Sequence, residues 1–486
     1  MSRNTRLTWS LLLLAGCGTA KDKNTGRESV AVTSSRRDQV DILFMIDNSP
    51  SMTPKQTLLQ QQFPLFIDKL KLFAQAGRPA SYHIGVVTSD LGAGPTSLGN
   101  AACVPGGQGG KLQSLGAAAG SACLPLADNF IDYNQLTNTD NLPDGQNVEA
   151  SFSCIAQVGD SGCGYEHQLE SIYSALRNPP AENVGFVRDD AVLAVVLLTD
   201  EDDCSAPPST DLFDPRQLQY GLANSFRCTE YGLEYGGQPQ FPLSEEQQTL
   251  GNIQSAPGAL EDTLPGHLWD LHRYTDLFTK SRSGGGLKDV PSDLFVATID
   301  APVVNDSIEV VRTAPCDQNM NIAECPTLSH SCVLATDSNF FADPAVRINQ
   351  AVSAAPHHSI QSICEPPYAS ALDQLSSHIA QQLEGCLPSA VRYADGSASC
   401  LVHDVDKSSG LSSLVPECDA TRSKLPCWTL LDNTSCTPQH NSITGQDEQL
   451  TLTTCREATC DPAQSAAPDT VENDAHCDLL TGHSAL

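Results

Sequence analysis

Asp47, Ser49 and Ser51 are spaced so that their side chains can bind one metal ion. They follow the apolar run 42–46, which has the composition of a buried strand. A carboxylate and two hydroxyls at alternate positions of a tight turn can direct three oxygens at one point, and hard cations such as Mg²⁺ and Ca²⁺ take oxygen ligands. The alternative is a strand that runs into an ordinary polar turn, because Asp, Asn, Ser and Pro are all turn formers.

The pattern Asp47-x-Ser49-x-Ser51 resembles the first loop of a von Willebrand factor A (VWA) domain, which in that family forms the metal-ion-dependent adhesion site (MIDAS). A second segment carries the same resemblance. The apolar strand 191–199 ends in Thr-Asp200, and strand, Thr, Asp is the order of the family's last metal loop. The resemblance implies that Asp200 binds the cation directly or through a water. Alternatively, Asp200 only caps the segment that follows it.

The family's middle loop normally supplies a threonine just before a helix, and this chain has none there. Glu166 is the side chain best placed to replace it, because a carboxylate also suits the start of a helix. The alternative is that Glu166 faces solvent. An additional carboxylate would satisfy the cation internally, which weakens its attraction for an acidic partner and moves preference toward Ca²⁺.

An acidic run, 200–203, begins at Asp200, and Thr88-Ser89-Asp90 ends another predicted strand. Both segments are expected at the same sheet edge as Asp47. They could add ligands, build a second Ca²⁺ site or form a solvated rim, and we favour the rim.

Apolar strands alternate with amphipathic helices over residues 40–388. Continuous apolar strands are typical of a mostly parallel sheet covered by helices on both faces. We therefore predict a doubly wound α/β domain with long insertions at about 91–151 and 204–266, and the resemblance to the VWA family implies a fold of the VWA or Rossmann-like kind. We expect strands at 40–46, 82–88, 191–199, 293–299 and 359–364, and helices at 53–76, 165–176, 268–280, 344–354 and 368–383. We expect the strands that precede Asp47 and Asp200 to lie side by side at the centre of the sheet, because both are continuously apolar and both end in acidic residues. Ligands bind such sheets at the carboxyl ends of strands, at the switch point.

The N-terminus has the features of a bacterial export signal. Two arginines precede an apolar stretch that is too short to span a bilayer as a mature helix. The stretch ends in Leu14-Ala-Gly-Cys17, which resembles a lipobox and implies that residues 1–17 end at an acylated Cys17. More than one acyl chain gives a stable anchor, and the following Gly18 favours the outer membrane of a Gram-negative bacterium. An ordinary signal peptide is the alternative. We expect residues 18–39 to form a flexible tether.

The chain contains 19 cysteines, and an even number remains if Cys17 carries lipid. Many cysteines after an export signal indicate disulfides, and the absence of any Cys-x-x-Cys argues against cysteine metal clusters and redox catalysis. We expect the first two candidates to staple the first insertion, and the next two to hold the Glu166 loop. The candidates are Cys103, Cys123, Cys154, Cys163, Cys204, Cys228 and Cys386.

Residues 389–486 are predicted to form a small, disulfide-held β module, because helical periodicity ends near Pro388 and cysteines become frequent. Eleven cysteines from Cys103 to Cys386 precede this boundary, and seven from Cys400 to Cys477 follow it. Since both counts are odd, full pairing requires at least one disulfide across the boundary. Cys386, at the end of the last predicted helix, is the candidate.

The charge composition and the absence of catalytic motifs argue against several classes of function. The 58 acidic and 27 basic residues give a net charge of −31, without any Lys/Arg-rich tract, which argues against nucleic acid or an anionic membrane surface as partner. The sequence has no His-Glu-x-x-His, no Gly-x-Ser-x-Gly and no phosphate-binding glycine loop, so we expect no enzyme.

Two functions remain in view. The first is a lipid-anchored envelope protein that uses Mg²⁺ or Ca²⁺ at a MIDAS-type site to hold an extracytoplasmic protein or glycan. The second is a structural envelope protein that metal and disulfides stabilise, without a metal-dependent ligand.

Overall fold

The computed structural model describes most of the 486-residue chain, in two compact units. The larger unit is residues 37–383, and the smaller one combines residues 1–36 with 384–486. The described residues are 29–32, 38–75, 80–95, 103–238, 247–262, 267–313, 325–384, 387, 390–406, 412–419, 421–432, 436, 438–456 and 471–478. Cys17 and Cys386, to which the sequence assigns a lipid and a crossing disulfide, lie outside these residues.

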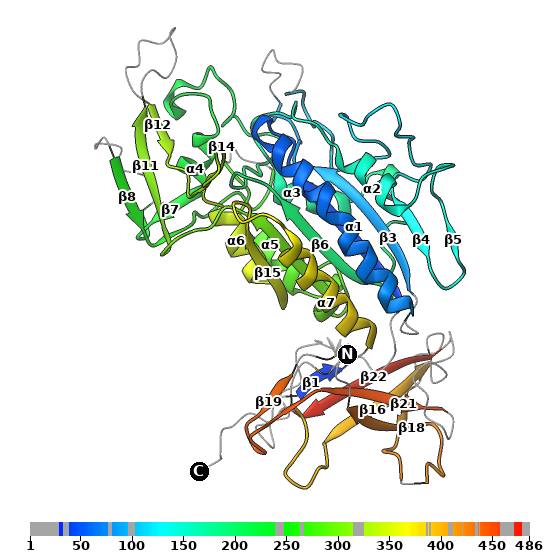
Figure 1. The fold of residues 1–486 in the computed structure, drawn as a ribbon. Coiled ribbons are helices and arrows are strands. Elements are labelled where there is room, and N and C mark those ends of the chain that lie inside the picture. The colour runs from blue at the N-terminus through cyan, green and yellow to red at the C-terminus, as the bar shows by residue number, and fades with distance from the viewer. Residues whose placement is uncertain are drawn as a thin grey trace, which may run out of the picture. The chain divides into compact units, whose positions relative to one another are not determined.

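A seven-stranded sheet in the order β15-β10-β6-β2-β3-β4-β5 forms the centre of the larger unit (Figure 1). The strands from β15 to β3 are parallel, and β4 and β5 continue the sheet antiparallel. The bounds are β2 Gln39–Ile46, β3 Ser81–Thr88, β4 Ile131–Asn134, β5 Thr139–Asp140, β6 Val192–Leu198, β10 Leu294–Asp300 and β15 His357–Ser362. The predicted α/β class with a mostly parallel sheet is confirmed.

Helices cover both faces of this sheet because side chains alternate along its buried strands. Ile42 and Phe44 of β2 share a core with helices α1 (Thr53–Gln75), α2 (Val148–Ala156) and α7 (Ala369–Glu384). Leu43 and Met45 point to the other face, against helices α3 (Gln168–Leu176), α5 (His272–Thr279) and α6 (Val346–Ser353). The short 3₁₀ helix η1 (Pro50–Met52) leads from the first loop into α1.

The expected insertion at about 91–151 is in part integral to the sheet, which the sequence analysis did not anticipate. It supplies β4 and β5, and α2 begins within it at Val148. The physical reason is that β3 offers a free edge, with which Ile131 and Tyr133 of β4 pair.

The remaining elements of this unit are short and lie in the second insertion and after β10. They form a β12-β11-β8 sheet and the pairs β7-β9 and β13-β14. Their bounds are α4 Phe226–Gly232, β7 Leu233–Tyr235, β8 Gln247–Gly251, β9 Ile253–Ser255, β11 Ser307–Thr313, β12 Cys325–Leu328, β13 Cys332–Leu334 and β14 Asp337–Ala342.

The smaller unit is a cysteine-rich β module, as the sequence predicts, but it contains an unexpected strand. The expected tether at 18–39 includes β1 (Ser29–Val32), which pairs antiparallel with β22 (Val471–Asp478). The physical reason is that β22, paired with β16 on one side, leaves its other edge free for the short apolar segment. The other strands are β16 Cys400–Asp406, β17 Ser412–Val415, β18 Cys427–Asp432, β19 Gln439–Asn441, β20 Gln446–Glu448 and β21 Leu450–Cys455.

No helix within the described residues is both long enough and apolar enough to cross a membrane.

Candidate metal centre

Asp47 and Asp200 follow neighbouring strands at the point where the strand order changes direction. The chain passes from β2 to β3 on one side and reaches β6 on the other. Ile46 pairs with Leu198, and the Asp47 backbone N–H donates to the Leu198 carbonyl at 2.9 Å. The central adjacency of these two strands, and the placement of both carboxylates at the same sheet edge, are as the sequence predicts.

Hydrogen bonds fix the Asp47 carboxylate, which is fully buried. Its Oδ1 accepts from the Ser49 backbone N–H at 2.8 Å and from Ser89 Oγ at 3.2 Å, and its Oδ2 accepts from Thr199 Oγ1 at 2.6 Å. Ser49 Oγ lies 3.3 Å from Ser51 Oγ. The first loop therefore brings the three predicted oxygen-bearing side chains together.

The Glu166 loop is fastened to the loops around it by backbone hydrogen bonds. Gly162 N–H donates to the Asn48 carbonyl at 2.9 Å, His167 N–H to the Ser89 carbonyl at 2.8 Å, and Cys204 N–H to the Glu166 carbonyl at 2.8 Å. A Cβ at residue 162 would lie 2.5 Å from Asn48 Oδ1, so only glycine allows this approach. Three loops from separate parts of the sequence thus meet at the carboxyl ends of β2, β3 and β6.

The Glu166 side chain is buried in this cluster and does not face solvent. It shares a hydrogen bond with Glu201, and its Oε2 has no partner within the described residues. Burial and the negative charges of Glu201 and Asp47 raise the pKa of Glu166 well above its ordinary value. Burial and the charge of Asp200 likewise raise the pKa of Asp47. The raised pKa values of Glu166 and Asp47 indicate that the groups around these two carboxylates do not balance their negative charges.

Lys55 is the cation that the sequence analysis missed. Its Nζ lies 2.5 Å from Asp200 Oδ2, and both side chains are buried, while Asp200 Oδ1 has no partner within the described residues. A signal for it exists in the sequence. A lysine in the first turn of a helix opposes the helix dipole and therefore needs a nearby anion.

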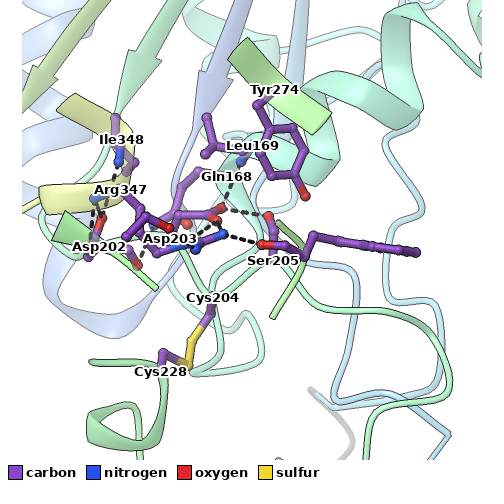
Figure 2. A network of polar contacts seen from close by, with 12 residues as sticks. Gln168, Leu169, Asp202, Asp203, Cys204, Ser205, Cys228, Tyr274, Arg347 and Ile348 are labelled. Carbon is purple, nitrogen blue, oxygen red and sulfur yellow. Dashed lines mark hydrogen bonds and ion pairs between the residues drawn. A yellow bond between two sulfur atoms is a disulfide. The ribbon is translucent and has the colours of Figure 1, made fainter. Parts of the chain in front are cut away.

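The solvated rim predicted for the acidic run is wrong for Asp202 and Asp203 (Figure 2). Asp202 Oδ1 accepts from the backbone N–H groups of Arg347 and Ile348 at 2.9 and 3.3 Å, at the start of α6. Asp203 Oδ2 lies 3.3 Å from Arg347 Nε, and its Oδ1 accepts from Leu169 N–H at the start of α3. The physical reason is that helix N-termini and a buried guanidinium take up these charges.

Disulfides join the loops in a pattern that differs from the predicted one. Cys103 bonds to Cys163 and Cys123 to Cys154, so the first insertion is fastened to the Glu166 loop and to α2 instead of being closed on itself. Cys204 bonds to Cys228, directly after the acidic run. Elsewhere Cys332 bonds to Cys364, Cys400 to Cys477 and Cys418 to Cys427.

The oxygen-bearing, acidic side chains of this cluster are of the type that binds a divalent cation. Asp47, Glu166, Asp200 and Glu201 act on one another electrostatically, and Lys55 is the basic side chain seen in contact with them. Burying charge without compensation is costly, and one oxygen each of Glu166 and Asp200 has no hydrogen-bond partner within the described residues. The ligand atoms are not drawn together as in a loaded site. Among the described residues, only Cys418, Cys427 and Cys455 bring three ligand atoms within 4.8 Å of one another, and these cysteines are in disulfides.

Comparison with known proteins gives limited information. No family model and no curated protein matches the sequence. Similar solved structures include a von Willebrand factor type A protein from Catenulispora acidiphila (10% identity, TM-score 0.28), the pilus adhesin SpaC from Lactobacillus rhamnosus GG (11%, 0.30) and the pilus adhesin RrgA from Streptococcus pneumoniae (9%, 0.27). Each comparison covers 93% of this chain, which spans 61%, 41% and 57% of those proteins' own lengths. TM-scores this low support no conclusion about function.

Proposed function

We propose that the chain is a VWA-type binding protein of the bacterial cell envelope, which holds a protein or glycan partner through a divalent cation. The observation that supports it is the surplus of buried carboxylates at the carboxyl ends of β2 and β6, opposed within the part of the chain that the structure describes by one ammonium in contact with them, that of Lys55. Asp47, Ser49, Ser51 and Glu166 would hold Ca²⁺ or Mg²⁺, with Asp200 as a direct or water-mediated ligand. The bound cation would supply a Lewis-acidic point for an oxygen of the partner.

The proposed location rests on the sequence of the N-terminus. A lipobox ending at Cys17 would place the protein on a membrane through its acyl chains, and we propose the outer membrane of a Gram-negative bacterium. The disulfides of both units suit an oxidising compartment of this kind.

A structural role is the second candidate, and one observation favours it. Lys55 already neutralises Asp200, and Glu166 shares a hydrogen bond with Glu201, so the cluster is assembled without a partner. The two functions differ in their response to EDTA. A binding protein loses partner capture while its melting temperature changes little, whereas a structural metal site loses melting temperature.

Asp47→Ala should abolish the binding of Ca²⁺ and Mg²⁺, because Asp47 is the carboxylate that the first loop holds at the centre of the cluster. Isothermal titration calorimetry on the purified full chain measures this. Asp41→Asn is the matched control, since Asp41 is a buried acid at the other end of the same strand, paired with Arg188. A wild-type protein that binds neither ion, or an Asp47→Ala variant that binds as the wild type does, would contradict the proposed function.

A further inference from the structure

Lys55 occupies a position where its charge requires an explanation. It lies in the first turn of α1, four residues after Ser51, and its side chain is fully buried. The positive end of the helix dipole and the loss of hydration both disfavour an ammonium there. A buried lysine persists only where other groups compensate for this cost.

Three kinds of group compensate for it. Nζ lies 2.5 Å from Asp200 Oδ2 and donates to the Ser51 carbonyl at 3.2 Å. It also lies 4.9 and 5.4 Å from the ring centroids of Phe340 and Phe341, a distance at which aromatic faces attract a cation. These contacts come from the loop after β2, the loop after β6 and strand β14. Three separate parts of the chain therefore hold the ammonium in place.

The contact with Asp200 bears directly on metal binding. Asp200 is one of the carboxylates proposed as a ligand, yet one of its two oxygens is committed to the ammonium. A divalent cation at this site must share Asp200 with Lys55 and also experiences repulsion from a positive charge a few ångströms away.

We infer that Lys55 is an internal counter-ion, which holds Asp200 in place when no metal is bound and lowers the affinity of the site for divalent cations. Only the effect of Lys55 on cation affinity rests on the proposed function. Its role in holding Asp200 in place concerns the protein without metal. The site would accordingly stay assembled in the absence of a cation, and binding would be a low-affinity, reversible step instead of a condition for folding.

The experiment compares Lys55→Gln with the wild type in two measurements on the full chain. In EDTA, Lys55→Gln should melt at a lower temperature, because Asp200 loses its buried partner. In calorimetric titrations it should bind Ca²⁺ and Mg²⁺ more tightly, by roughly tenfold or more, because the competing charge is gone. Lys55→Arg, which keeps the positive charge, should resemble the wild type in both its melting temperature in EDTA and its affinity for Ca²⁺ and Mg²⁺.

Lys69→Gln is the matched control, because Lys69 lies on the same helix and makes a surface ion pair with Asp373. It should change neither measurement appreciably. If Lys55→Gln does not fold, Lys55→Met, which suits the Phe340 and Phe341 surroundings, takes its place.

The outcomes separate this inference from the proposed function. Unchanged melting in EDTA, or an unchanged affinity where the wild type binds a cation, would overturn the counter-ion role. If neither protein binds Ca²⁺ or Mg²⁺, the proposed function is wrong, and the melt in EDTA alone decides the role of Lys55. Tight binding by Lys55→Gln and weak binding by the wild type would support the inference most directly.

Discussion

At the scale of single residues, Asp47 owes its position to neighbours that carry no charge. Gln168 Nε2 donates to Thr199 Oγ1 at 3.0 Å, and Thr199 Oγ1 donates to Asp47 Oδ2 at 2.6 Å. This relay runs from the start of α3 through the end of β6 to the end of β2. It fixes one carboxylate oxygen, while Ser49 and Ser89 hold the other. The carboxylate is therefore preorganised before any ion arrives.

Replacing Glu166 by threonine tests the residue that departs from the VWA pattern. Glu166→Thr should keep cation binding but shift preference from Ca²⁺ toward Mg²⁺, because Ca²⁺ accepts more carboxylate oxygens and Mg²⁺ prefers few ligands in octahedral geometry. We expect the affinity for Ca²⁺ to fall by roughly tenfold relative to that for Mg²⁺. Competition titrations of the two ions measure the ratio.

Glu182→Thr is the control for this change of charge, since Glu182 is an exposed acid paired with Lys111. A Glu166→Ala protein with unchanged affinity for both ions would remove Glu166 from the set of ligands.

Residue-level prediction succeeded where a motif specifies both type and spacing. Asp47, Ser49 and Ser51 lie within one loop, so their spacing alone brings them together. Lys55 was missed, and Glu201 was expected only as part of the acidic run, because their roles depend on contacts across loops that are distant in sequence. Lys55 meets Asp200 only because β2 and β6 are neighbours, and a lysine in an amphipathic helix ordinarily lies at the surface.

At the scale of elements, the apolar pattern predicts strands and helices whose burial is continuous. β2, β3 and β6 are buried along almost their whole length. Their predicted bounds differ from the observed ones by one residue at one end for β2 and β3, and by one residue at each end for β6. The strands β4 and β1 were missed for a common reason. Each is four residues long, and its pairing is decided by a free edge of another strand, which a local pattern does not reveal.

Helix α7 contributes a pH dependence to stability through His378. Burial, and then the charge of His357, lowers the pKa of His378 to about 3 from 6.5, and its ring stacks on Phe295. The folded protein thus binds this proton less readily than the unfolded chain does. The stability that His378 contributes is full above pH 6.5 and is lost as the pH falls toward 3, by up to about 1.4 kcal/mol per pH unit.

His378→Phe should therefore lose less stability than the wild type between pH 7 and pH 4. Urea unfolding at a series of pH values measures the difference between the two proteins. His272→Phe is the control, because His272 lies in the same unit with an exposed side chain. Parallel pH profiles for the wild type and His378→Phe would contradict the assignment.

At the scale of the whole molecule, the chain begins and ends in the same unit. Strand β1 pairs with β22, so the polypeptide enters the cysteine-rich module before it forms the parallel sheet. A lipid on Cys17 would consequently be closest in sequence to the module and not to the candidate metal centre.

The last prediction is a disulfide that crosses between the two parts. Cys436 and Cys455 are disulfide-bonded. The six disulfides whose two partners are both identified join eight of the eleven cysteines from Cys103 to Cys386 and four of the seven from Cys400 to Cys477. Each of these pairs stays on its own side of the boundary, so an odd number remains on both sides. Full pairing then requires a crossing bridge, for which Cys386 is the candidate.

Non-reducing peptide mapping should link the Cys386 peptide to one from residues 400–477, and the link should vanish on reduction. Cys386→Ser should leave an odd thiol in the module that reacts with maleimide after unfolding. If a free thiol is found on each side of the boundary in the wild type, the parity argument does not hold and the two units are joined by the backbone alone.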